Sequence, residues 1–199
     1  MQVEVTGLSH RFGEAAPLFS DVTFTLTPNN VYALTGPSGS GKSTLLSILA
    51  GWTEPTGGTV RRDSVRSIAW VFQNPHGVAG RTAEDHVALP LLARGMLHAD
   101  ARREARQRLD RVGLASVASA PFHQLSGGEA QRLMLARGMA AAPDLLLVDE
   151  PTAQLDTTSS DAVNQALSSL AVDGTIIVVA THDARTRDAC TSAIDLAAH

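Results

Sequence analysis

The sequence has too little cysteine for a disulfide and no apolar segment long enough to span a membrane. Its one cysteine, Cys190, has no second cysteine to pair with in the chain. No apolar run approaches the ~20 residues that a helix needs to cross a bilayer. The first residues also lack the basic and then apolar pattern of a secretion signal. We therefore expect a chain that does not itself cross a membrane.

Positive charge is scarce as well. The chain has 16 Lys and Arg against 20 Asp and Glu, a net charge of −4, which predicts no nucleic-acid partner. Of the 16 basic residues, 15 are Arg and one is Lys42. A lone lysine indicates a site that needs a compact ammonium group, although chance in an Arg-rich composition explains the same count. With 199 residues, 44% of them hydrophobic, the chain can bury a core as one folded domain.

Hydrophobic patterning alternates between strand and helix along the chain. The strand pattern occurs at residues 22–26, 31–35, 67–72, 145–148 and 176–180. Helices are predicted after residue 41, at 99–112 and at 157–170, and the stretch 74–124 is helical in character. This order predicts an α/β fold with a parallel sheet and an inserted helical lobe. The five arginines of 99–112 predict a solvated helix face with charge pairs, in preference to a nucleic-acid patch.

A glycine-rich loop stands between the second predicted strand and the first helix. The run Gly36-Pro37-Ser38-Gly39-Ser40-Gly41-Lys42-Ser43 fits G-x-x-x-x-G-K-[ST], and Thr44 follows it. Backbone N–H groups of such a loop and of the helix start bind phosphate, Lys42 reaches the β- and γ-phosphates, and Ser43 ligates Mg²⁺. The alternative is a glycine-rich turn without a ligand. The position between strand and helix favours nucleotide binding.

Two carboxylates follow the apolar strand 145–148. Ligands of parallel sheets bind at the carboxyl ends of the strands, so Asp149 is predicted beside the phosphate loop, where it holds Mg²⁺ directly or through water. Glu150 is then placed to orient or deprotonate an attacking water. The alternative is a pair of turn or capping carboxylates before Pro151.

A further motif, Leu125-Ser126-Gly127-Gly128-Glu129 with Gln131-Arg132 after it, resembles the signature of the ATP-binding cassette (ABC) ATPases. Other motifs of that family occur in its usual order between about residues 3 and 183. They are the phosphate loop, Gln73, the signature, Asp149-Glu150, a D-loop at 151–156 that includes Asp156, and a switch histidine, His182.

The resemblance implies a fold and a domain division. It implies an α/β P-loop NTPase core with a mostly parallel sheet, an N-terminal antiparallel β-subdomain and an inserted α-helical subdomain. The single domain 1–199 is then divided into a core of 1–73 and 142–199 and a helical part of 74–141. The sequence departs from the family at Pro28-Asn29-Asn30, where a glycine-containing turn is usual, and at Gln154. Asn can adopt the same turn conformation.

The resemblance also implies roles for residues that composition and spacing do not assign. Two copies sandwich two ATPs head to tail. Ser126 and the backbone amides of Gly127 and Gly128 form a second anion cradle, because the N–H groups at the start of a helix bind anions. Glu129 and Asp156 join the nucleotide contacts. Gln73 contacts Mg²⁺ and water, and His182 contacts the γ-phosphate and helps hold Glu150, so Glu150, His182 and Gln73 form the catalytic set. Phe12 has two interpretations, core packing or stacking on adenine.

The segment 82–92, with Gly95 after it, resembles the ATPases of lipoprotein-release, macrolide-export and haem-export systems. This implies a separate transmembrane subunit, a cytoplasmic location on the inner face of the membrane, and export. We expect that subunit to dock near Gln73 and the segment 74–92. The alternative is an ABC ATPase that drives a non-transport partner, such as a regulator of a cell-wall hydrolase. A DNA-repair ATPase is excluded, because residues 74–124 cannot contain a long coiled coil.

Overall fold

A three-stranded antiparallel sheet forms the N-terminal part of the computed structural model, which describes residues 1–169 and 174–198. Its strand order is β2-β1-β4, with β1 at Gln2–His10, β2 at Phe19–Leu26 and β4 at Gly57–Asp63. On β2, Val22 and Leu26 are buried while Thr23 and Thr25 are exposed. The predicted strand at 22–26 and its alternation are therefore confirmed.

The second sheet has five strands, all parallel, in the order β5-β6-β7-β3-β8. Their bounds are β3 Asn30–Thr35, β5 Ile68–Val71, β6 Leu145–Asp149, β7 Ile176–Ala180 and β8 Ser192–Asp195. The first four confirm predicted strands, and β8 is an additional edge strand. Before β3, Asn29 has a φ of 62° and accepts a hydrogen bond from the Gly174 N–H at its Oδ1 atom (2.8 Å). Asparagine thus does adopt the turn conformation for which glycine is usual.

The helices confirm the α/β class. They are α1 Lys42–Ala50, α2 Ala83–Ala93, α3 His98–Arg111, α4 Gly127–Ala140, α5 Thr157–Ser169 and the short α6 Ala184–Asp188. Three 3₁₀ turns lie at Ala115–Val117, Phe122–Gln124 and Leu196–Ala198. The predicted helix 99–112 is shifted by one residue, and the predicted end at Leu170 lies outside the described residues. Along the chain, α2, α3 and α4 lie between β5 and β6.

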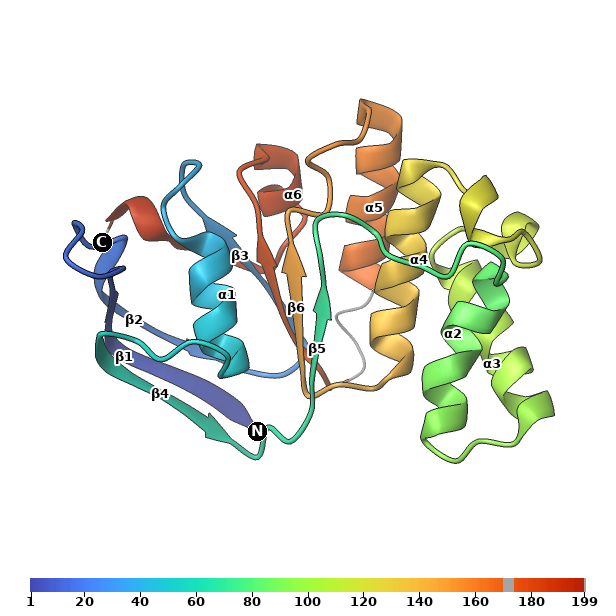
Figure 1. Cartoon of the computed structure of the whole chain (residues 1–199), viewed down its shortest axis with the longest axis horizontal. Coiled ribbons are helices and arrows are strands. Elements are labelled where there is room, and N and C mark those ends of the chain that lie inside the picture. The colour runs from blue at the N-terminus through green and yellow to red at the C-terminus, as the bar shows by residue number, and fades with distance from the viewer. Residues whose placement is uncertain (170–173, 199) are drawn as a thin grey trace.

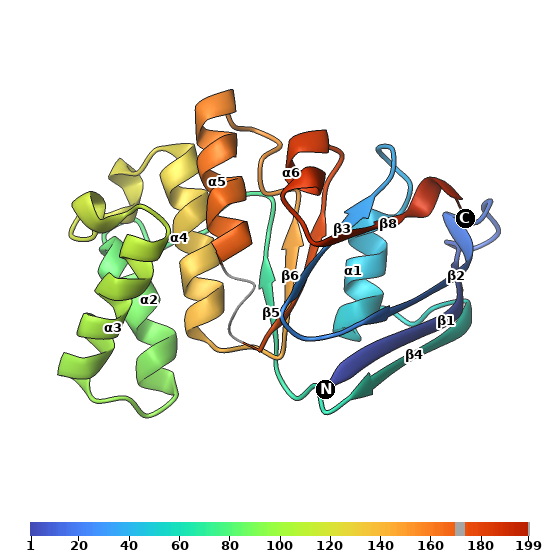
Figure 2. The same cartoon turned by 180° about the vertical axis from the view of Figure 1, so that it is seen from behind.

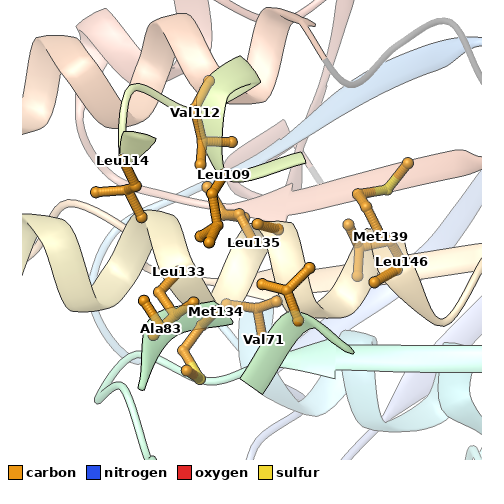
Figure 3. Close-up of a cluster of buried hydrophobic side chains, with 14 of the residues drawn as sticks. Val71, Ala83, Leu109, Val112, Leu114, Leu133, Met134, Leu135, Met139 and Leu146 are labelled. Carbon is orange, nitrogen blue, oxygen red and sulfur yellow. The ribbon is translucent and has the colours of Figure 1, made fainter. Parts of the chain in front are cut away.

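Both faces of the parallel sheet are buried, as the apolar run on β6 predicts. Leu145 and Leu147 belong to a core that α1 shares with the antiparallel sheet, and α1 lies between the two sheets (Figure 1). Leu146 and Val148 face a second core under α4 and α5, which cover the other face of the sheet (Figure 2). This second core continues without a break into α2 and α3 (Figure 3). The inserted helices therefore share the hydrophobic core of the sheet.

The arginines of α3 do more than form a solvated face. Arg102 and Arg106 both pair with Glu84 on α2, whose side chain is buried, and the Arg106 Nε to Glu84 Oε2 distance is 2.7 Å. Arg103 and Arg108 make the predicted pairs along α3, with Asp100 and Glu104. Arg102 and Arg106 are themselves 40% and 64% exposed, so the predicted solvated face with charge pairs is confirmed. These two arginines also supply the cationic partners that a buried carboxylate needs. None of the helices in the described part of the chain is long and apolar enough to cross a membrane.

Candidate active site

Three neighbouring strands end at one edge of the parallel sheet and carry the predicted site residues. The phosphate loop follows β3, His182 follows β7, and Asp149 and Glu150 end β6. The backbone ties these ends together, because the Glu150 N–H donates to the Ala180 carbonyl (2.9 Å) and the Thr181 N–H to the Leu34 carbonyl (3.0 Å). A parallel sheet therefore brings together residues that are more than a hundred positions apart in the sequence.

The phosphate loop needs glycine for packing as well as for backbone freedom. Gly41 has a φ of 91°, and a Cβ there would lie 2.9 Å from the Phe19 ring. Gly41 is also the N-cap of α1, and within the described residues no side chain caps this helix and no acidic residue occupies its first turn. The first N–H groups of α1 are thus open to an anion, as the prediction of a phosphate cradle requires.

Lys42 folds back over the loop that carries it. Its Nζ donates to the Gly36 carbonyl (2.9 Å) and to the Pro37 carbonyl (3.1 Å), and it lies 3.5 Å from Oε1 of Glu150. The side chain is nearly buried. The ammonium is therefore held at the loop opening by two carbonyls and one carboxylate.

Asp149 and Ser43 meet across the site. The Ser43 hydroxyl donates to Oδ1 of Asp149 (3.1 Å). Burial raises the pKa of Asp149 above its ordinary value and the charge of Glu150 adds to this, while the Ser43 hydrogen bond and Lys42 act in the opposite direction. A half-buried carboxylate beside a hydroxyl, at the mouth of a phosphate loop, is a donor set suited to Mg²⁺.

Glu150 lies between two basic groups. Its Oε2 atom is 2.9 Å from Nδ1 of His182, and its Oε1 atom faces Lys42. The backbone of Glu150 has a φ of 44°, a left-handed conformation that is rare for a residue with a side chain. This turn directs the carboxylate back toward the phosphate loop. Strained backbone of this kind is concentrated at functional sites.

A cavity of about 730 Å³ lies at this edge of the sheet, lined by Lys42, Ser43, Glu150 and His182 but not by Asp149. Its lining includes eleven of the predicted residues: Phe12, Pro37, Ser38, Gly39, Gly41, Lys42, Ser43, Thr44, Gln73, Glu150 and His182. Leu18 and Ala153 also line it, and neither has a polar group by which the sequence could have marked it. Phe12 is exposed and meets the His10 ring edge to face at 4.9 Å, so it is not core packing. Size, open N–H groups, ammonium and Mg²⁺ donors together fit ATP with Mg²⁺.

The signature motif lies away from this cavity, at the start of α4. Ser126 caps α4, and both its N–H and its hydroxyl donate to Oε2 of Glu129 (2.8 Å each). These hydrogen bonds lower the pKa of Glu129. Gly128 packs so closely on α5 that a Cβ would lie 2.8 Å from Cβ of Ser159. Within one chain, the predicted second anion cradle is thus separate from the phosphate loop.

Asp156 is not brought to the cavity either. Its carboxylate accepts hydrogen bonds from the Ser159 N–H (3.0 Å) and the Ser159 hydroxyl (2.8 Å). The Ser159 N–H lowers the pKa of Asp156, with the hydroxyl contributing. In this chain Asp156 therefore supports the first turn of α5, a local contact that a D-loop motif does not specify.

Comparisons with known proteins identify the family of the chain. A family model described as ABC transporter matches residues 19–153. The lipoprotein-releasing system ATP-binding protein LolD of Anaeromyxobacter dehalogenans is 38% identical over 90% of this chain and 82% of LolD. The cell division ATP-binding protein FtsE of Escherichia coli is 38% identical over 81% of this chain and 79% of FtsE.

A solved structure agrees in fold. It is the dimeric post-hydrolysis state of the ATP-binding cassette MJ0796 bound to ADP and Pi, with a TM-score of 0.80 and 30% identity over 98% of this chain and 94% of that one. The chain therefore belongs to the ABC transporter family, as an ATP-binding cassette that binds ATP with Mg²⁺ and hydrolyses ATP.

Proposed function

We propose that two copies of this chain close head to tail around two ATPs and thereby drive a separate membrane subunit, in export. The observation that carries the proposal is the separation of the two anion cradles. The phosphate loop and the start of α4 lie along the same edge of the molecule but well apart (Figure 1). Ser126 and Gly127 are exposed there, and neither lines the nucleotide cavity. Only a second copy can bring a signature to a bound γ-phosphate.

The contacts support a role for each site residue. Lys42 and the α1 N-terminus bind the β- and γ-phosphates, and Ser43, Asp149 and Gln73 hold Mg²⁺, which when bound neutralises charge on the transferred phosphoryl group. Glu150 takes the proton of the attacking water. His182, 2.9 Å from that carboxylate, keeps it aimed at the phosphate loop. Phe12, exposed at the cavity rim, offers its ring face to adenine.

This chain has a surface suited to docking of the membrane subunit. A groove of about 490 Å³ lies between β5 and the inserted helices, and its lining includes Trp70, Phe72, Leu89, Pro90, Met134 and Arg137. Trp52, Trp70 and Phe72 stack in a row with ring centroids 4.7 and 5.5 Å apart. Trp52, Phe72 and Leu89 are 64%, 49% and 60% exposed. A cluster of exposed aromatic and aliphatic side chains of this kind marks a protein interface.

A non-transport partner is the second candidate. FtsE, a cell division protein, has the same 38% identity as LolD, so similarity to relatives does not separate the two. The nucleotide site and the groove serve either partner. What distinguishes them is the chain that occupies the groove.

The test uses the Glu150→Gln variant, which keeps the site geometry but removes the base. Size-exclusion chromatography with ATP and Mg²⁺ should show a dimer for Glu150→Gln and mostly monomer for the parent. Glu150→Gln combined with Lys42→Ala, which weakens phosphate binding, is the matched control and should stay monomeric. Monomers throughout, at high protein concentration, would contradict the sandwich.

The partner is identified by affinity purification of the dimer-trapped chain from membranes in mild detergent. A co-purifying transporter-type membrane chain, lost on Leu89→Glu in the groove, supports transport. A co-purifying membrane chain that recruits a cell-wall hydrolase supports the second candidate and contradicts export.

A further inference from the structure

The loop after Gln73 is held in place by histidine side chains. We call residues 74–82 the bridging loop. Three of its carbonyl oxygens meet a histidine Nδ1 atom: Asn74 with His76 (2.5 Å), Ala79 with His123 (2.7 Å) and Thr82 with His86 (2.7 Å). The loop also accepts backbone hydrogen bonds from the segment before the signature, at Arg81 from Phe122 (2.9 Å) and at Ala79 from His123 (3.2 Å). It therefore links Gln73 to the chain that leads into Ser126.

Both ring nitrogens of His86 form hydrogen bonds with this loop. His86 lies on α2, is only 6% exposed, and its Nε2 atom accepts a hydrogen bond from the Val78 N–H (3.0 Å). A backbone carbonyl can only accept, so Nδ1 facing Thr82 must carry the proton. A backbone N–H can only donate, so Nε2 facing Val78 must carry a lone pair. The partners thus require the neutral imidazole in its Nδ1–H form.

A proton added to Nε2 would remove one of these two bonds. It would point an N–H at the N–H of Val78, which then has no acceptor at that position. The surroundings leave little room to adjust. The Phe122 ring packs against the His86 ring with centroids 5.4 Å apart, and a Cβ on Gly77 would lie 2.5 Å from Phe122. The close-packed arrangement of the bridging loop therefore depends on the charge state of His86.

The charged groups around His86 offer little compensation. Arg81 from the bridging loop, Asp85 from α2, and His98 and Arg102 from α3 line a cavity of about 380 Å³ together with His86. Asp85 is bonded to the Thr82 N–H (3.2 Å) and lies 3.7 Å from Arg102, so its charge is already matched.

We propose that neutral His86 is a positioning residue that clamps the bridging loop, and that its protonation releases the loop and weakens the coupling of the membrane subunit to the ATP site. The coupling half rests on the proposed function, in which the partner docks beside this loop. The clamp half concerns the isolated chain alone, so the two halves can fail separately.

The experiment is NMR on the full-length ¹⁵N-labelled chain at pH 8 and pH 5.5, which bracket ordinary histidine titration. At pH 8 we expect the ¹⁵N shifts of His86 to report the Nδ1–H tautomer. Val78 amide protection, corrected for intrinsic exchange, should fall roughly five- to tenfold at pH 5.5, the worth of one hydrogen bond. His86→Gln keeps an acceptor near Nε2 without titrating and should be protected at both pH values. His86→Asn keeps only the donor toward Thr82 and should be unprotected at both.

His98→Gln is the matched control, because it removes a second imidazole ring from the same cavity and should behave like the parent. Equal Val78 protection of the parent at both pH values, or an Nε2–H tautomer at pH 8, would overturn the clamp. A loss of protection at pH 5.5 in His86→Gln would assign the effect to another group and overturn it as well. If the clamp behaves as expected, lowering the pH from 8 to 5.5 should reduce partner-stimulated ATPase more in the parent than in His86→Gln. Equal slopes would overturn the coupling half alone.

Discussion

Single residues in this site are placed by several constraints at once, and Glu150 is the clearest case. Its backbone is left-handed, its N–H is bound to the end of β7, and its carboxylate lies between Lys42 and His182. Such a conformation costs about 1–3 kcal/mol in a residue with a Cβ. The carboxylate therefore has a fixed direction before nucleotide binds.

Asp149→Asn should stabilise the nucleotide-free chain while weakening Mg²⁺ binding. The raised pKa means that the folded state holds the Asp149 proton more tightly than the unfolded chain does. The contribution of this carboxyl to folding stability is therefore lost as the pH rises through its raised pKa, and Asn, which has no proton to lose there, avoids the loss. At pH 8 we therefore expect a higher melting temperature for Asp149→Asn than for the parent.

This gain should shrink as pH falls toward about 4, where the carboxyl of an ordinary aspartate is protonated too. Differential scanning calorimetry over pH measures it, with Asp161→Asn, an exposed carboxylate, as the control. A lower melting temperature for Asp149→Asn at pH 8 would contradict the expected cost of the buried charge. Stabilisation by ATP with Mg²⁺ should be reduced in the variant.

Lys42 gives the second prediction at this scale. Lys42→Met keeps the length of the side chain but removes the ammonium, so ATP affinity should fall roughly ten- to a hundredfold, the worth of one charge-assisted contact. Lys42→Arg should not restore affinity, because a planar guanidinium does not fit between the Gly36 and Pro37 carbonyls. Fluorescent ATP-analogue titration measures this, and full affinity in Lys42→Arg would contradict it.

Hydrophobic patterning in the sequence predicts some strands of this fold and misses others. The alternation in β2 and the apolar runs of β3, β6 and β7 reflect burial directly, so these strands were predictable. β1 was not, because a register shift between Val5 and Leu8, at left-handed Gly7, breaks its alternation. β8 is short and mostly exposed, so it carries no hydrophobic pattern.

The site divides in the same way. The phosphate loop, Asp149 and Glu150 follow from local sequence and from where parallel strands end. The bond of Asp156 to Ser159 and the bridge from Lys42 through Glu150 to His182 depend on a backbone turn and on tertiary packing, which no local pattern encodes. Sequence thus predicts which groups gather more reliably than which partner each one holds.

The contact between α4 and α5 gives a prediction at the scale of elements. Gly128→Ala places a Cβ 2.8 Å from Ser159, whereas the same change at Gly127 meets Leu155 at an ordinary 3.4 Å. Overpacking of this kind costs about 1–3 kcal/mol, so Gly128→Ala should lower the melting temperature and Gly127→Ala should leave it nearly unchanged. Adding Ser159→Gly should recover part of the loss. Equal melting temperatures for both alanine variants would show that the two helices separate easily.

At the scale of the whole molecule, the nucleotide cavity of one chain gathers the other proposed parts of a hydrolytic site, while the proposed second anion cradle of the same chain lies elsewhere, at the start of α4. The carboxyl ends of β3, β6 and β7 carry the phosphate loop, the proposed Mg²⁺ ligands and the proposed base. The signature lies at the start of α4, an inserted helix that shares the hydrophobic core of the sheet. Its position relative to the phosphate loop is therefore fixed by packing. Two copies related by a two-fold axis would therefore complete two equivalent sites.

Mixing two inactive variants tests this shared arrangement. Lys42→Ala disables the phosphate loop, and Gly127→Asp places a negative charge in the signature where a γ-phosphate is to bind, while an acidic residue in the first turn is favourable for the helix itself. Each variant alone should be nearly inactive. In a head-to-tail dimer of one Lys42→Ala chain and one Gly127→Asp chain, one site combines the altered phosphate loop with the altered signature. The other site combines an intact phosphate loop with an intact signature.

Half of the dimers in an equimolar mixture are mixed, and each has one intact site of two, so the mixture should regain roughly a quarter of the parent ATPase rate. Lys42→Ala mixed with the double variant Lys42→Ala/Gly127→Asp has no intact phosphate loop and should stay inactive. Recovery in the first mixture and none in the second would assign each site to two chains. Activity of Gly127→Asp alone, or no recovery in the first mixture when chromatography shows dimers, would contradict independently working shared sites.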